Sequence, residues 1–141
     1  MLKLNSSHNY KEPPPSRILP VLQKLKELYL LWYGYYQILP KTHRHSLGQR
    51  IDNLFVEAIE AVVIASFLSP AEKIPYVRLA IRKTDTLKIM LMILWETDSL
   101  NDKQYIPISI KFDEIGRNLG GWNGQLTKQN SPDNNRKSGE K

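Results

Sequence analysis

The sequence of 141 residues contains no cysteine and only three histidines, His8, His43 and His45. The absence of cysteine excludes disulfide bridges, thiolate metal ligands and cysteine nucleophiles. His43 and His45 are two positions apart, so on a helix they would point in different directions. A zinc site needs more ligands that converge on one point. We therefore expect these histidines to cap a turn or to lie at the surface.

Patterns typical of enzymes are also missing. The Asp and Glu residues are scattered at the spacing of helix surfaces, and no pair suggests general acid–base chemistry. The glycines lie within a helical pattern and not between a strand and a helix, so they do not form a phosphate-binding loop. A metal or ligand site inside a helical bundle would need paired Glu and His facing inward, and none is expected. We predict a non-enzymatic protein with no catalytic residue, metal ion or cofactor.

The sequence has no long apolar run. Runs such as 61–65 and 89–95 hold five and seven residues, whereas a membrane span needs about 18 unbroken apolar residues. Residues 1–16 are polar and contain three consecutive prolines, so they lack the apolar segment of a signal peptide. We therefore expect a cytoplasmic protein with no membrane partner.

The two ends of the chain differ in composition from its middle. The prolines at 13–15 favour an extended conformation, which predicts a flexible leader over residues 1–16. Residues 127–141 are rich in Gln, Asn, Ser and charge, which predicts a disordered tail. The length of the chain suits one domain, and we expect that domain over residues 17–126.

The expected domain contains four stretches with the three-and-four spacing of amphipathic helices. Their ranges are 17–39, 46–68, 71–98 and 102–125. The connections between them are short, so neighbouring helices are expected to be antiparallel. The pattern predicts an all-α fold, an antiparallel up-down-up-down four-helix bundle.

Helix boundaries are also visible in the sequence. Pro40 ends the first helix, because the residue before a proline disfavours the helical conformation. Ser46 with Gln49, and Asn101 with Gln104, have the spacing of capping boxes at the starts of the second and fourth helices.

The predicted helices carry more apolar surface than one bundle covers. Residues 61–65 and 89–95 are apolar around the whole helix, and the first helix holds five aromatic residues in two turns. A helix that is apolar all round must be covered on several sides. Aromatic residues and methionine are enriched in protein interfaces, which favours a homo-oligomer over a large core with exposed aromatics. The residues that we assign to oligomer contacts or packing are Trp32, Tyr36, Met90 and Met92.

Glycines recur in the fourth helix with a spacing of four. Each costs about 1 kcal/mol relative to alanine inside a helix. We interpret Gly116, Gly120 and Gly121, with Trp122 beside them, as a surface for close packing, and Gly124 as the helix cap. The alternative is that Gly120 and Gly121 simply end the helix.

Two segments resemble a known family. Residues 113–122, DEIGRNLGGW, resemble the closing motif of the accessory variability determinant proteins of diversity-generating retroelements. Residues 39–51, LPKTHRHSLGQRI, resemble the first interhelical connection of that family. The resemblance covers roughly residues 17–126.

The resemblance implies a barrel-like homopentamer of four-helix protomers that is positively charged and binds nucleic acid. It also implies association with the reverse transcriptase of the retroelement and its template RNA, in support of mutagenic retrohoming, in which variable cDNA replaces part of a target gene. A related group, the four-helix proteins encoded in intervening sequences of large-subunit ribosomal RNA, shares the connection but usually lacks the Gly-Gly-Trp. A structural protein of that type, without a reverse transcriptase, is the alternative.

The basic residues form two clusters that suit a polyanion. The chain has 20 Lys and Arg against 14 Asp and Glu, a net charge of +6. Lys and Arg bind phosphates without reading the base sequence. The residues that we predict to contact nucleic acid or a partner are Arg78, Arg82, Lys83 and Lys88 in the third helix, Lys41, Arg44 and Arg50 near the first turn, and Arg117 in the fourth helix.

Each of these residues also has a structural alternative. Arg78 has the spacing to pair with Glu72 or Asp85, and Arg82 with Asp85, as surface ion pairs of little energetic value. Arg50, three positions before Asn53 and seven before Glu57, could instead be internal and cap the neighbouring helix. Arg117 could pair with Asp113 or Glu114 and fix the helix end.

Overall fold

A computed structural model of the chain describes residues 19–131, and all of the regular structure within this range is helical. The predicted all-α fold is therefore confirmed. The predicted leader lies outside the described residues, and so do residues 132–141 of the predicted tail. The helices are α2 (Pro20–Gln37), α3 (Lys41–Arg44), α4 (Leu47–Ser66), α5 (Pro70–Glu96) and α6 (Asp102–Gln129).

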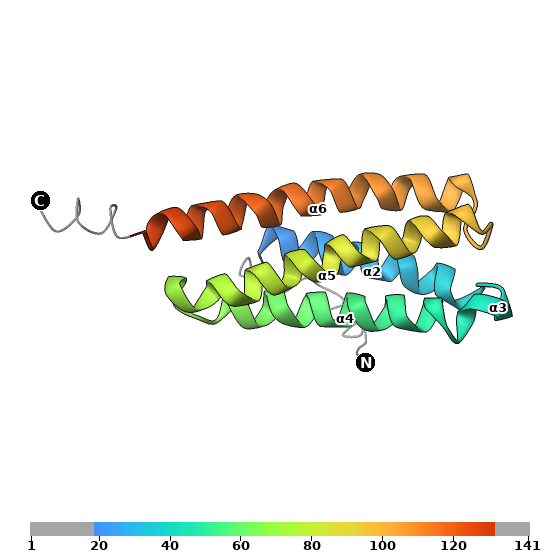
Figure 1. Ribbon diagram of the computed structural model, residues 1–141, viewed down its shortest axis with the longest axis horizontal. Helices are drawn as coiled ribbons and strands as arrows, with labels where there is room; N and C mark the ends of the chain where they lie inside the picture. The colour runs from blue at the N-terminus through green and yellow to red at the C-terminus, as the bar shows by residue number, and fades with distance from the viewer. Residues whose placement is uncertain (1–18, 132–141) are drawn as a thin grey trace, which may run out of the picture.

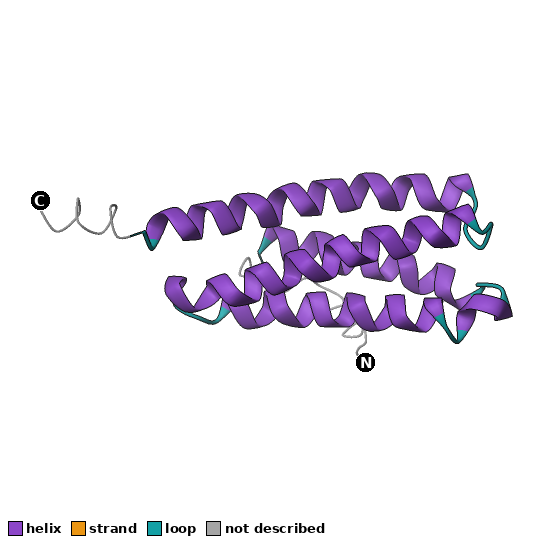
Figure 2. Cartoon of the chain, viewed as in Figure 1, coloured by secondary structure: helices purple, strands orange, loops and turns teal. Residues whose placement is uncertain are grey.

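Four long helices lie side by side, and the single turn of α3 lies at one end between α2 and α4 (Figure 1). Consecutive long helices run in opposite directions, because short loops join them at alternate ends (Figure 2). Helix α4 packs on α2 and α5, and α6 also packs on α2 and α5. Helices α2 and α5 therefore lie diagonally across from each other.

The core lies between the long helices and is centred on aromatic side chains. Trp32 is completely buried, stacks on Tyr36 and Phe55 with ring centroids 5.4 Å and 6.1 Å away, and donates a hydrogen bond of 3.2 Å to Oδ1 of Asp52. Burial and the neighbouring Asp52 raise the pKa of Tyr29 to about 12. Of the two roles expected for Trp32, oligomer contact or packing, the protomer therefore shows packing in the core, because the ring has no exposed surface to offer to a second copy.

The helix starts agree in part with the sequence. The capping box of α6 is confirmed: the side chain of Asn101 accepts from the backbone of Gln104 at 2.9 Å, and Gln104 accepts in return at 3.0 Å. The box predicted at the start of α4 is wrong, since the Ser46 hydroxyl donates instead to the carbonyl of Thr42 in α3. The one-turn helix α3 was not predicted, and its presence draws Ser46 away from the cap.

Helix α4 begins against α3 at a buried glycine. A Cβ atom on Gly48 would lie 2.8 Å from Cδ1 of Leu39 and 2.9 Å from the carbonyl oxygen of His43, both shorter than normal contacts. Gly48 therefore lets the α2–α4 connection pack closely. Gly34, in the last turn of α2, would place its Cβ atom in open space.

Alanine at these two glycines is expected to have opposite effects. Gly48→Ala should lower the free energy of unfolding by about 1–3 kcal/mol, because the backbone of α3 must move away. Gly34→Ala should raise it by up to about 1 kcal/mol through helix propensity. Urea unfolding followed by circular dichroism measures both variants. Equal effects at the two positions would show that the close approach at Gly48 does not exist.

Candidate nucleic-acid interface

Two arginines of α5 lie exposed one turn apart on its outer side. Arg78 donates to Oδ1 of Asn123 at 3.2 Å and to the hydroxyl of Thr127 at 3.5 Å, both on α6. These partners are neutral, so the guanidinium charge is not compensated. The guanidinium group of Arg82 makes no hydrogen bond or ion pair with any residue in the described range. Neither arginine therefore forms the ion pair with a nearby acid that was its structural alternative.

The lysines of the same predicted cluster are engaged in ion pairs. Nζ of Lys83 lies 2.9 Å from Oε1 of Glu57, whose Oε2 lies 3.6 Å from Nη1 of Arg50. The hydrogen bond from Lys83, with the charges of Lys83 and Arg50, lowers the pKa of the Glu57 carboxyl. Nζ of Lys88 lies 3.3 Å from Oδ1 of Asp113. The structure thus separates the predicted cluster into two arginines that form no ion pair and two paired lysines, and it pairs Arg50 with Glu57 of the same helix at the surface.

The basic cluster at the first turn is largely used for structure. The guanidinium of Arg44 donates to the carbonyl of Leu39 at 2.8 Å and 3.1 Å, which satisfies a carbonyl beyond the end of α2. The His43 ring and the Ser99 hydroxyl share a hydrogen bond of 2.6 Å that ties α3 to the α5–α6 loop, and His45 is exposed. Lys41 remains exposed at the surface. This region therefore offers little concentrated positive charge.

Arg117 lies on the side of α6 that faces away from the core. Neither acid expected to pair with it does so, because Asp113 binds Lys88 and Glu114 binds Nζ of Lys24 at 2.8 Å. Lys24 lowers the pKa of the Glu114 carboxyl. The side chain of Arg117 makes no hydrogen bond or ion pair within residues 19–131.

Contacts between α5 and α6 fix the positions of the three arginines along the length of these two helices. Arg78 bonds to Asn123 and Lys88 pairs with Asp113, so the two antiparallel helices are in a fixed register. Arg117 is then level with residue 84 of α5, between Arg82 and Lys88. At 1.5 Å per residue, the arginines span on the order of 10 Å along the helices. We call Arg78, Arg82 and Arg117 the arginine face; the charge of Arg117 also helps to lower the pKa of Glu114, whose carboxylate pairs with Lys24.

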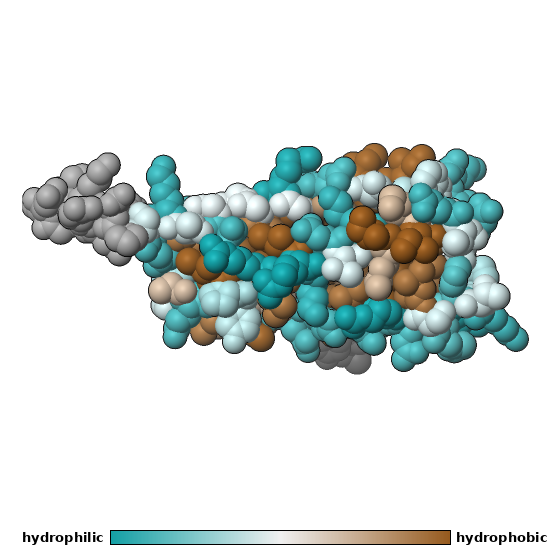
Figure 3. Space-filling model, viewed as in Figure 1, coloured by the Kyte–Doolittle hydropathy of each residue, from teal (hydrophilic) through white to brown (hydrophobic). Residues whose placement is uncertain are grey.

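An exposed apolar patch adjoins the arginine face at the α5–α6 loop end. Figure 3 shows apolar side chains gathered over this part of α5 and α6, with hydrophilic side chains beside them. The exposed fractions of the four residues range from 38% to 63%. Within each helix they are four apart, so each pair shares one face. We call this set the isoleucine patch: Ile89, Ile93, Ile106 and Ile110.

A second exposed apolar face lies on α2. Leu30, Tyr33 and Ile38 are all more than half exposed. Because α2 and α5 lie diagonally across from each other, this face and the isoleucine patch belong to different sides of the protomer. The other residues predicted to meet a second copy are partly buried: Tyr36, Met90 and Trp122 pack against the core, and Met92 is half-buried.

The glycines of α6 do not end the helix and do not approach a neighbouring helix. Helix α6 continues to Gln129, so the prediction that Gly124 is the cap is wrong, and so is termination at Gly120. A Cβ atom on Gly116, Gly120 or Gly121 would meet nothing within 4 Å. Packing within the protomer therefore does not require these glycines, and a role between copies stays a prediction.

The described residues also lack features of other protein classes. None of the helices in the described range is long and apolar enough to cross a membrane. Between residues 19 and 131, no three side chains of His, Asp or Glu lie close enough together to hold a metal ion.

No protein-family model matches the sequence, and the search of curated proteins finds no significant match. The family resemblance therefore rests on residues 39–51 and 113–122 alone.

Proposed function

We propose that the protein is a non-enzymatic accessory subunit of a diversity-generating retroelement. In this role a basic homo-oligomer of four-helix bundles binds template RNA or cDNA and the reverse transcriptase, in support of mutagenic retrohoming. The observation that carries nucleic-acid binding is the arginine face, whose three guanidinium groups have no acidic partner among the described residues. The retroelement itself is supported by the resemblance of residues 39–51 and 113–122.

The arginine face suits phosphates better than it suits an acidic peptide. Guanidinium groups form bidentate hydrogen bonds with phosphate oxygens. Along the helix axes the three arginines are about 3–6 Å apart, and the phosphates of one strand follow each other about every 3.4 Å along a duplex. Unlike Lys83 and Lys88, the arginines are not neutralised by acids of their own chain. A polyanion would therefore gain their full charge without first breaking an ion pair.

Self-association is supported by the two apolar faces. When one face of a protomer binds a different face of the next copy, the copies assemble head to tail. Such an assembly closes into a ring if the rotation between neighbouring copies allows it. The α2 face and the isoleucine patch have this relation. Gly116 and Gly120, which nothing in their own protomer requires, give a second copy a smooth helix surface. The number of five subunits comes from the resemblance.

Nucleic-acid binding and assembly can be measured on the full chain. Fluorescence anisotropy with labelled RNA, combined with multi-angle light scattering, should show an oligomer that binds RNA and releases it as salt rises. An oligomer that ignores RNA at moderate salt would favour the alternative, a structural protein of the ribosomal intervening-sequence type. One observation favours that alternative: Arg44 is engaged in hydrogen bonds, and Arg50 and Lys83 in ion pairs, within their own chain.

The proposed association with a reverse transcriptase can be tested by examining the genes beside this one. A reverse-transcriptase gene beside this one, with a template and variable repeat pair, is the expected neighbourhood. The enzyme encoded there should be retained by the immobilised full chain, and its retention should survive nuclease treatment. Loss of the enzyme after nuclease treatment would mean that RNA alone joins the two proteins.

A further inference from the structure

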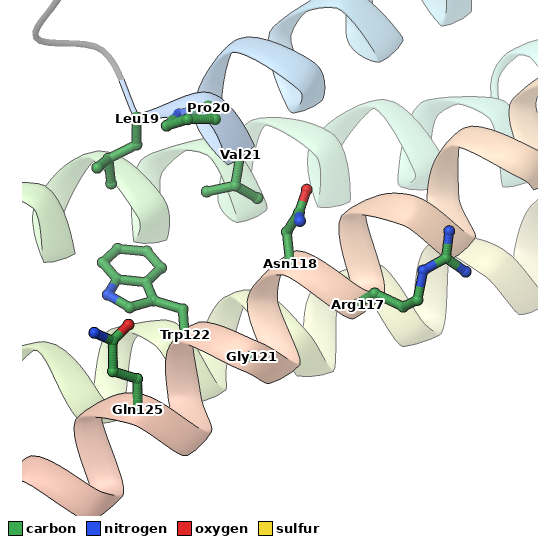
Figure 4. A pocket seen from close by; sticks show the side chains of 8 residues that line it. All are labelled: Leu19, Pro20, Val21, Arg117, Asn118, Gly121, Trp122 and Gln125. Carbon is green, nitrogen blue, oxygen red and sulfur yellow. The ribbon is translucent and has the colours of Figure 1, made fainter.

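A pocket of about 420 Å³ lies between the start of α2 and the middle of α6. Figure 4 shows Leu19, Pro20 and Val21 on one side and the Trp122 ring on the other, with Gly121 between Trp122 and Arg117 along α6. The volume is within the range of about 300–1,000 Å³ that small-ligand sites occupy. The pocket is thus large enough for a nucleotide-sized group and too small for a protein helix.

The pocket combines an aromatic ring with polar groups that are free to bind. Trp122 is partly buried against the core, which holds its indole ring in place. The side chains of Gln125 and Arg117 make no hydrogen bond with any described residue. The amide oxygen of Asn118 accepts from Nζ of Lys24 at 2.9 Å, which leaves its amide nitrogen available as a donor. An aromatic face beside unused amide donors and a guanidinium group is the chemistry that binds a nucleobase and its phosphate.

Gly121 keeps this pocket open. A Cβ atom at this position would meet nothing within 4 Å, so no neighbour forbids a side chain there. A glycine inside a helix nevertheless costs about 1 kcal/mol relative to alanine. Since Gly121 lines the pocket, any larger side chain would project toward the space beside Trp122.

We propose that this pocket receives one unpaired nucleobase, stacked on Trp122 and hydrogen-bonded by Gln125 or Asn118, while Arg117 holds the adjoining phosphate. This inference rests on the proposed nucleic-acid binding and deepens it, because Arg117 belongs to both the arginine face and the pocket. A strand that crosses the arginine face would reach the pocket at Arg117. The bases of a duplex are stacked and paired, so a duplex would bind the arginine face but leave the pocket empty. The protein therefore prefers single strands.

Filling the pocket tests the proposal on the full chain. The probes are a fluorescein-labelled single-stranded RNA, an abasic strand of the same length and an RNA duplex, compared by anisotropy at one salt concentration. The wild type should bind the single strand about 5- to 100-fold more tightly than the abasic strand, as one stacked base contributes. Gly121→Leu should abolish this ratio and leave duplex binding unchanged.

The matched control is Gly124→Leu, one turn further along α6. This position is also open within 4 Å but does not line the pocket, so the variant should retain the wild-type ratio. Circular dichroism checks that both variants fold. Equal affinity of the wild type for the single and abasic strands would overturn the pocket proposal, and so would an unchanged ratio in Gly121→Leu. Failure to bind any of the three probes would instead overturn the proposed function.

Trp122 offers a second, independent readout. Stacking of a base on its ring should quench tryptophan fluorescence when the single strand binds, and the abasic strand should leave the emission unchanged. Trp32 is buried and Trp95 is stacked on Tyr105, so neither is available to the strand in the same way. The quench should disappear in Trp122→Phe. A quench that persists in this variant would contradict the assignment of the base to Trp122.

Discussion

Trp32→Ala is expected to lower the free energy of unfolding by about 3–5 kcal/mol, the range for removal of a fully buried large aromatic side chain. The variant removes the stacks with Tyr36 and Phe55 and the hydrogen bond to Asp52. It also opens a cavity at the contact of α2 with α4. Urea unfolding at a fixed protein concentration, followed by circular dichroism, gives the value.

Trp95→Ala is the matched control for Trp32→Ala. The Trp95 ring stacks on Tyr105 at 4.9 Å and donates to Asp102 at 2.7 Å, but 36% of the residue is exposed. Its removal should cost only about 1 kcal/mol, since little buried volume is lost. If the two variants lose similar stability, Trp32 does not occupy the centre of the core.

Removing the three charges of the arginine face is expected to reduce affinity for duplex RNA on the order of 10- to 100-fold. The variant is Arg78→Gln with Arg82→Gln and Arg117→Gln. Each lost phosphate contact should also reduce the slope of log affinity against log salt by about 0.9. A duplex probe confines the test to the arginine face, because the pocket beside Trp122 binds an unpaired base.

Three lysines on other surfaces provide the control with the same change of charge. Lys26, Lys103 and Lys111 are exposed and lie outside the arginine face. Glutamine at all three should lower affinity only slightly, through the reduced net charge. Equal losses in the two triple variants would mean that the protein binds RNA through its overall charge and not through a defined surface.

Most of the fold was predictable from the sequence because its apolar spacing is long and regular. The four long helices begin and end within a few residues of the predicted ranges, and Asn101 caps α6 as expected. The errors lie where tertiary contacts override local preference. Helix α3 takes the Ser46 hydroxyl from its expected cap, and α6 continues through Gly120 and Gly124 to Gln129.

The candidate site was less predictable, because the sequence does not give the register between helices. Local spacing suggested that Arg78 and Arg117 pair with acids of their own helix. The two acids expected for Arg117 pair instead with lysines of other helices, Asp113 with Lys88 and Glu114 with Lys24. Arg78 instead reaches Asn123 on α6. Which cations remain without acidic partners therefore depends on packing between elements that are far apart in the chain.

Which aromatic residues are buried also depends on packing between helices. The sequence shows an excess of aromatic side chains in α2, but it does not show which of them the core absorbs. Trp32 lies wholly inside, whereas Tyr33 on the next position is exposed. Part of the excess apolar surface lies in the run 89–95 that the sequence indicates, since Ile89 and Ile93 are exposed, and part lies on Ile106 and Ile110, which the sequence did not single out. On α5 and α6 it consists of the isoleucine patch.

The claim on which the account depends is that copies of this chain cover each other's apolar faces. Sedimentation equilibrium of the full chain measures this directly, since one protomer has a mass of 16.4 kDa. The account predicts a single species at an integral multiple of that mass, which Ile93→Gln with Ile110→Gln shifts toward the protomer. A wild-type mass of 16.4 kDa at every concentration tested would contradict it.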